Sequence, residues 1–185
     1  MATTHLVLGG ARSGKSRFAI ASQPHRARVA FVATAEAGDA AMAQRIARHR
    51  GERPGHWLTV EEPYALATSL GRLAGRPIDA VVVDCLTLWV ANRLLRGDAD
   101  EAILDEGAQL AALIARRPWD LTLVTNEVGE GVHPESTDGL RFRDLLGLVN
   151  QRVAAACDRV TLMVAGLPLT VKLPTPTDGL AAQAP

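Results

Sequence analysis

The stretch Gly9-Gly10-Ala11-Arg12-Ser13-Gly14-Lys15-Ser16 fits every fixed position of the phosphate-binding pattern G-x-x-x-x-G-K-[ST]. Glycines let such a loop turn its backbone N–H groups toward phosphate oxygens, and we expect Lys15 to be an exposed loop cation that reaches the β- and γ-phosphates. The Ser16 hydroxyl is the expected ligand of Mg²⁺. An apolar stretch at residues 5–8 predicts a strand before the loop, and residues 16–22 predict a helix after it. All eight residues are therefore assigned to a nucleotide-binding P-loop.

Apolar runs of strand length alternate with helical spacing along the rest of the chain. Strands are predicted at residues 28–33, 57–60, 78–84, 121–125, 159–165 and 169–172. Helices are predicted from an Asp39 cap to Gly51 and at residues 64–73, 86–95, 101–116 and 140–157. This order predicts an α/β fold of the P-loop NTPase type. We expect a mostly parallel sheet with helices on both faces, a C-terminal antiparallel edge strand, and the ligand at the carboxyl ends of the strands.

Length and composition favour a single domain. The chain has 185 residues, which predicts one catalytic domain at residues 1–173 and a disordered tail, rich in Pro, Thr, Gly and Ala, at residues 174–185. The formal net charge is zero, which argues against a nucleic-acid partner. No targeting segment opens the chain and its apolar runs are too short to span a bilayer, so we expect the cytoplasm. Cys85 and Cys157 lack metal-ligand spacing, and we expect both to be buried.

Several predicted strands deliver polar residues to the expected ligand edge. Asp84 ends the β-branched run 78–84, which makes its carboxylate a candidate for Mg²⁺ or for the nucleotide. Ala33, Thr34 and Ala35 leave the strand at 28–33 beside the phosphates, so they are assigned to nucleotide binding. Glu127 follows the strand at 121–125 and is a candidate base toward a substrate hydroxyl. A loop contact or a contact to metal-bound water explains Glu127 equally well.

Four further segments narrow the function. They are residues 45–57 (RIARHRGERPGHW), 125–135 (TNEVGEGVHPE), 142–144 (FRD) and 149–152 (VNQR). Together they resemble the bifunctional adenosylcobinamide kinase / adenosylcobinamide-phosphate guanylyltransferase family of cobalamin synthesis. The likeness runs from Leu6 to Lys172.

The resemblance implies two reactions. ATP or GTP phosphorylates the aminopropanol hydroxyl of the corrinoid adenosylcobinamide, and GMP then passes from GTP to that phosphate while pyrophosphate leaves. The family carries GMP on a histidine of an R-I-x-x-H-x-x-x-R-P stretch, which falls on His49 here. The resemblance also implies a homotrimer and a catalytic role for His49. The P-loop pattern itself makes Mg²⁺ the expected cofactor and gives Lys15 a catalytic role. The resemblance adds the following residues to nucleotide binding: Gly51, Glu52, Arg53, Pro54 and Glu61.

This sequence departs from the family at two positions. Some members have two adjacent histidines where this chain has Arg48-His49, and relatives can carry Glu at the position of Asp84. His56 is a less suitable nucleophile because it is offset from the pattern.

The chemistry of residues 45–53 agrees with a nucleophilic His49. A neutral imidazole can attack the α-phosphorus when cations neutralise the phosphate oxygens, and Arg45, Arg48, Arg50 and Arg53 supply such cations. An alternative interpretation is a histidine on a solvated, arginine-rich helix face. Two other functions then stay open: a small-molecule kinase without nucleotidyl transfer, and a nucleotide-dependent switch or assembly ATPase.

Overall fold

A seven-stranded sheet organises the computed structural model, which describes residues 2–174 apart from the side chains of Ala41 and Arg45. The strand order is β3-β2-β4-β5-β1-β6-β7; only β7 runs antiparallel to its neighbour. The strands are β1 (Thr4–Gly9), β2 (Val29–Ala33), β3 (Leu58–Glu61), β4 (Ala80–Asp84), β5 (Asp120–Val124), β6 (Arg159–Val164) and β7 (Leu167–Lys172). The helices are α1 (Lys15–Ala21), α2 (Ala40–Gly51), α3 (Leu66–Leu73), α4 (Leu86–Leu95), α5 (Asp100–Arg116) and α6 (Thr137–Ala156).

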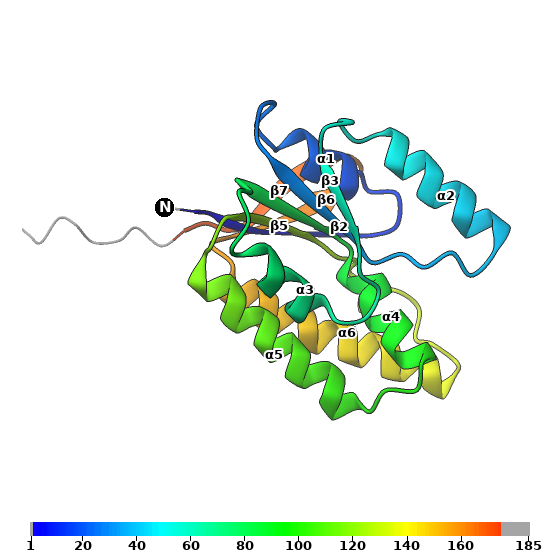
Figure 1. Cartoon of the computed structure of the whole chain (residues 1–185). Coiled ribbons are helices and arrows are strands. Elements are labelled where there is room, and N and C mark those ends of the chain that lie inside the picture. Colours follow the sequence, from blue (N-terminus) through cyan, green and yellow to red (C-terminus); the bar gives the residue numbers. More distant parts are fainter. Residues whose placement is uncertain (1, 175–185) are drawn as a thin grey trace, which may run out of the picture.

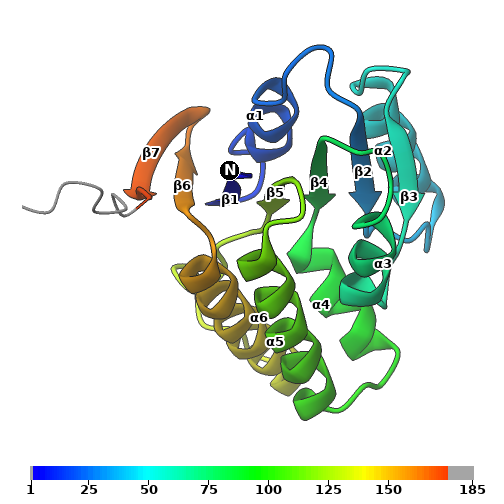
Figure 2. The same ribbon diagram turned by 60° about the vertical axis from the view of Figure 1, so that its left-hand side comes forward.

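Helices cover both faces of the sheet, as the alternation of elements predicts. Figures 1 and 2 show α3, α4, α5 and α6 on one face and α1 on the other. Since side chains alternate along a strand, β4 sends Val81 and Val83 into the larger core under α3–α6, and Val82 toward α1. The predicted α/β, P-loop NTPase-type fold is confirmed, including the C-terminal antiparallel edge strand.

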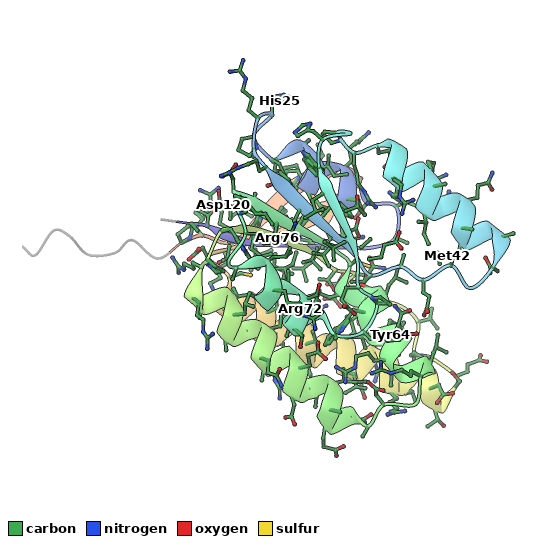
Figure 3. All side chains as sticks on the ribbon, in the orientation of Figure 1. His25, Met42, Tyr64, Arg72, Arg76 and Asp120 are labelled. Carbon is green, nitrogen blue, oxygen red and sulfur yellow. The ribbon has the colours of Figure 1, made fainter. Side chains whose placement is uncertain are left out.

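Helix α2 lies outside these two layers. It projects beyond the β3 edge of the sheet (Figure 1), and Met42 lies near its beginning (Figure 3). Asp39 caps it as predicted, because the carboxylate accepts a hydrogen bond of 2.7 Å from the Met42 backbone N–H. The helix ends at Gly51, also as predicted.

Several element boundaries differ from the prediction, and at three of them a side chain or a turn gives the reason. Helix α6 begins at Thr137 rather than at 140, since the Ser136 hydroxyl accepts the N–H of Gly139. Helix α3 begins at Leu66 rather than at 64, because the Glu62 carboxylate binds the two preceding N–H groups. Strand β7 begins at Leu167 rather than at 169, since Ala165 and Gly166 alone make the turn, both with positive φ.

The cysteine expectation is half right. Cys157 is 2% exposed, whereas Cys85 is only half-buried. Burial raises the pKa of both thiols to about 12.

Two remaining predictions concern the C-terminal tail and membrane-spanning segments. The predicted tail lies outside the described residues from position 175 onward. Among the described residues, no helix is long and apolar enough to cross a membrane.

Candidate active site

The loop between β1 and α1 adopts the shape that its glycines permit. Gly9 has φ +149°, and a Cβ at this position would lie 2.6 Å from the carbonyl oxygen of Met163 on β6. Gly14 begins α1 with φ +92°, a conformation that disfavours other residues. The loop also contacts the β6–β7 turn, because the Gly166 N–H donates to the Ser13 carbonyl at 3.1 Å. The loop is thus held between β1 and β6.

Lys15 lies inside this loop, which corrects the expectation of an exposed cation. The residue is 7% exposed, and its ammonium donates to the Gly10 carbonyl at 2.6 Å and to the Ser13 hydroxyl at 3.4 Å. Carbonyl and hydroxyl oxygens therefore surround the charge where phosphate oxygens are expected. The predicted role of Lys15 is unaffected, but its replacement now also removes packing.

Strand register brings the predicted strand-end residues into one row. Ala33 of β2 pairs with Glu61 of β3 on one side and with Asp84 of β4 on the other, and Asp84 pairs with Val124 of β5. Glu61 and Asp84 are thus two strands apart, about 10 Å at the neighbouring-strand spacing. Residues in register on parallel strands share a face, and Ala33 and Val124 lie on the α1 face. The two carboxylates therefore face the side on which the P-loop helix lies.

Arg53 joins the segment after α2 to this row. Its guanidinium stacks 3.6 Å above the ring of Phe31, and its Nε is buried without a hydrogen-bond partner among the described residues. Burial lowers the pKa of Arg53, while the carboxylates of Asp84, Glu61 and Glu52 act in the opposite direction. A half-buried cation with an unused N–H group, next to the carboxyl edge, has room for an anionic partner.

His49 has a carboxylate neighbour on the next turn. Its Nδ1 lies 3.2 Å from a carboxylate oxygen of Glu52, three residues later. The adjacent Arg50 forms an ion pair with Glu61, which ties α2 to the end of β3. Of the other arginines predicted around His49, Arg48 is exposed, and the side chain of Arg45 lies outside the described part of the structure.

A hollow of about 430 Å³ separates α2 from the sheet edge. The loop after β2, the inner side of α2 and the ends of β3 line it. The lining residues include Ala35, Glu36, Ile46, Arg50, Glu61 and Pro63. Two of the predicted nucleotide-binding residues, Ala35 and Glu61, thus open onto the same space as the helix that carries His49.

His56 lies elsewhere. It is exposed and lines a separate hollow with residues from the beginnings of β2 and β4, such as Val29 and Ile78. Parallel strands place their beginnings at the edge opposite the P-loop. This position weighs against His56 as the nucleophile.

Glu127 is adjacent to the P-loop through its backbone. Its N–H donates to the Gly9 carbonyl at 3.2 Å, so the chain after β5 continues alongside the start of the loop. Its carboxylate accepts the N–H of Gly129 at 2.8 Å, which closes a small turn and leaves the second carboxylate oxygen without a hydrogen bond to the described residues.

Four residues around the site escaped the sequence prediction or have a role that it did not assign. The Thr34 hydroxyl bonds to both backbone groups of Cys85, and Asn92, Thr87 and Asn150 bind the loops that leave the strands. Asn150 belongs to a segment that carries the family resemblance, but no local pattern indicates its partners. The role of Thr34 in nucleotide binding stays a prediction, and so do the roles assigned to the other predicted site residues.

Metal binding depends on more than protein side chains here. In the described part of the chain, no group of three or more His, Cys, Asp or Glu side chains is placed to hold a metal ion. Mg²⁺ commonly binds through one or two protein oxygens together with substrate phosphates and water. The Ser16 hydroxyl and the Asp84 carboxylate, both at the carboxyl edge, fit that pattern.

Comparison with protein families gives one match over nearly the whole chain. Residues 5–171 match the family model described as cobinamide kinase / cobinamide phosphate guanyltransferase. The bifunctional adenosylcobalamin biosynthesis protein CobP of Pseudomonas aeruginosa is 46% identical over 169 residues, which cover 90% of this chain and 96% of that protein. The bifunctional adenosylcobalamin biosynthesis protein CobU of Salmonella typhimurium is 43% identical over 180 residues, covering 90% and 98%. CobU of Escherichia coli is 42% identical with the same coverage.

Among solved structures, a similar fold occurs in an ATPase from the type III secretion system of pathogenic bacteria. The TM-score is 0.54 at 12% identity, and the match covers 91% of this chain and 56% of that chain. At this identity the likeness shows a shared fold and nothing further.

Proposed function

Because the chain belongs to the cobinamide kinase / cobinamide phosphate guanyltransferase family, a family of bifunctional enzymes, we propose that it carries out both reactions through the residues described above. The substrates are adenosylcobinamide, ATP or GTP for the kinase step, and GTP for the transfer. The single observation that carries the proposal is the row of Glu61, Ala33 and Asp84 between the P-loop and the helix that bears His49. This row allows both reactions to take place at the carboxyl ends of the same strands.

In the kinase step, the aminopropanol hydroxyl of the corrinoid attacks the γ-phosphorus of the nucleotide. A new P–O bond forms, the bond to the β-phosphate oxygen breaks, and the nucleoside diphosphate leaves. Lys15 and the loop N–H groups stabilise the charge on the transferred phosphoryl group. Glu127 accepts the hydroxyl proton in this proposal, supported by its backbone bond to Gly9.

In the transfer step, His49 acts as nucleophile through Nε2. The Glu52 carboxylate lies 3.2 Å from Nδ1 and favours the tautomer with hydrogen on Nδ1, which leaves the lone pair on Nε2. Nε2 attacks the α-phosphorus of GTP, and pyrophosphate leaves. A phosphate oxygen of adenosylcobinamide phosphate then attacks the same phosphorus, which gives adenosylcobinamide-GDP and restores neutral His49. Arg53 binds the phosphates, since its buried Nε lacks a partner among the described residues.

Ser16 and Asp84 would hold Mg²⁺ on the nucleotide phosphates. The ion would neutralise phosphate charge during both displacements.

A homotrimer and a cytoplasmic location are part of the same proposal. Side chains exposed on one side of β7 support a subunit contact, because Leu167, Leu169 and Val171 alternate along the strand and are each more than half exposed. Sedimentation equilibrium measures the subunit number directly.

Separate assays of the two steps test the function. With adenosylcobinamide, ATP and Mg²⁺ we expect adenosylcobinamide phosphate; with that product and GTP we expect adenosylcobinamide-GDP and pyrophosphate. A kinase without transfer would convert only the first acceptor. Nucleotide hydrolysis that is equal with and without acceptor would contradict the proposal and favour a switch or assembly ATPase.

A further inference from the structure

A closed ring of hydrogen bonds lies at the carboxyl end of β5, under the active-site edge. Thr125, Asn150 and Thr87 form it with the backbone of Asn126, and their side chains come from the end of β5, from α6 and from the start of α4. Thr125 is 0%, Asn150 6% and Thr87 8% exposed. Water therefore has little access to replace any of these bonds.

The direction of each bond in the ring follows from its donors and acceptors. The Asn150 amide nitrogen must face the Asn126 carbonyl (3.0 Å), since a carbonyl oxygen only accepts. Its amide oxygen then accepts from the Thr125 hydroxyl (2.8 Å). The Asn126 N–H donates to the Thr87 hydroxyl (2.7 Å), whose own hydrogen is directed to Thr125 at 3.4 Å. Every polar atom of the ring is used, and such rings strengthen cooperatively.

This ring fixes the segment that carries Glu127. Flanking backbone bonds join Thr125 to Val7 (3.0 Å) and Glu127 to Gly9 (3.2 Å), so the segment runs along the start of the P-loop. Asn150 reaches the same segment from the opposite face of the sheet, because Thr125 follows Val124 and points toward α6. The backbone that carries Glu127 is thus held from both sides.

A second asparagine, Asn92, binds the segments that follow β2 and β3. The Asn92 amide on α4 donates to the Thr34 carbonyl (2.7 Å) and to the Pro63 carbonyl (3.3 Å). One turn earlier, the indole N–H of Trp89 donates to the Tyr64 carbonyl at 2.7 Å, and Figure 3 shows Tyr64 beside this helix. The segments after β2 and β3 are therefore both attached to α4.

These segments lead to the residues of the transfer step. The chain passes from Thr34 through residues 35–39 into α2, which carries His49. The residues before Pro63 include Glu61, the ion-pair partner of Arg50 on α2. In the described structure no hydrogen bond joins Asn92 to the ring around Asn150.

We propose that Asn150 and Asn92 are positioning residues for different half-reactions: Asn150 orients the Glu127 segment for phosphorylation, and Asn92 orients the root of α2 for guanylyl transfer. This inference rests on the proposed function. Both side chains act through the groups that they bind. Small displacements of reacting groups are costly, since a shift of about 1 Å can reduce a rate about 100-fold.

The test measures both half-reactions on the same variants. Asn150→Ala should lower kcat of the kinase step about 10- to 100-fold, with the KM for nucleotide within about twofold of the wild-type value. Its rate of protein-bound GMP formation from GTP alone should change less than about threefold. Asn92→Ala should show the reverse, and each variant is the matched control for the other. All rates are measured well below the melting temperature of each variant.

A second, isosteric substitution keeps the test valid if Asn150→Ala folds poorly. Asn150→Asp retains the acceptor for Thr125 but, when ionised, cannot donate to the Asn126 carbonyl. A protonated carboxyl can donate, and burial favours that form. The kinase kcat of Asn150→Asp, relative to the wild-type value at each pH, should therefore rise as pH falls from about 8 to about 6.

These outcomes distinguish a failure of this inference from a failure of the proposed function on which it rests. Equal loss of both activities in each alanine variant, together with no relative recovery of Asn150→Asp at lower pH, would show a purely structural role and overturn the inference. Absence of protein-bound GMP in the wild-type enzyme would instead contradict the proposed function. The kinase arm would in that case still decide the role of Asn150.

Discussion

Replacing Thr34 by Val tests whether its hydroxyl serves the protein rather than the nucleotide. The residue is 0% exposed, and its hydroxyl donates to the Cys85 carbonyl and accepts the Cys85 N–H, both at 2.7 Å. Valine has nearly the same shape, so the substitution removes both bonds without leaving a cavity. It leaves two backbone groups of Cys85 without their partners.

The size of the effect follows from these two groups. An unsatisfied buried group costs about 1–3 kcal/mol, and the half-buried position of Cys85 favours the lower end because water can partly replace the hydroxyl. We expect the free energy of unfolding to fall by about 2–3 kcal/mol. For a chain of this length the melting temperature should fall by about 4–12 °C.

Urea unfolding and nucleotide titration measure the two consequences separately. Thr34→Ser is the matched control, since it keeps the hydroxyl and loses only a buried methyl group, at about 1 kcal/mol. Nucleotide affinity should change less than about threefold in both variants. If Thr34→Val kept its stability but lost nucleotide affinity, the hydroxyl would bind nucleotide and this reasoning would be refuted.

Three further substitutions have outcomes set by the structure. Gly9→Ala should destabilise the fold by about 1–3 kcal/mol and impair both activities, because its Cβ would lie 2.6 Å from the Met163 carbonyl oxygen. Gly10→Ala is the control in the same urea unfolding experiment. It should be tolerated, since no atom of the described residues lies within 4 Å of the added Cβ. Lys15→Ala should lower kcat of the kinase step at least about 100-fold, and circular dichroism must show a folded protein for that loss to count. Burial, and secondarily Arg159, lowers the pKa of His5 below 6.5, so its neutral form stabilises the fold fully above that pH and the contribution is lost on acidification. The melting temperature of His5→Gln should therefore fall less between about pH 7.5 and 5.5 than that of the wild type, and equal slopes would contradict this.

The sequence was sufficient for the features that local patterns encode. The P-loop, the alternation of strands and helices, and the acid at the end of β4 are contiguous signals, and parallel register then aligns Asp84 with Ala33 and Glu61. The Asp39 cap was equally readable, since it depends on residues three positions apart. Such features need no knowledge of distant contacts.

The remaining features depend on contacts between distant segments. Asn150 and Thr125 are 25 residues apart, and Asn92 and Thr34 are 58 apart, so no local spacing indicates these bonds. Lys15 was expected to be exposed because a loop motif says nothing about its own packing. The Glu52 partner of His49 is a different case: the i, i+3 spacing was present in the sequence and predicts a shared helix face.

The mass of the protein after incubation with GTP and Mg²⁺, without acceptor, tests the central claim most directly. The account predicts a gain of one GMP per active site, bound through a P–N linkage that mild acid removes and base does not. His49→Ala should gain no mass while keeping part of its kinase activity, because phosphoryl transfer to the corrinoid hydroxyl needs no covalent carrier. An acid-labile GMP adduct that persists in His49→Ala would contradict the assignment of the nucleophile.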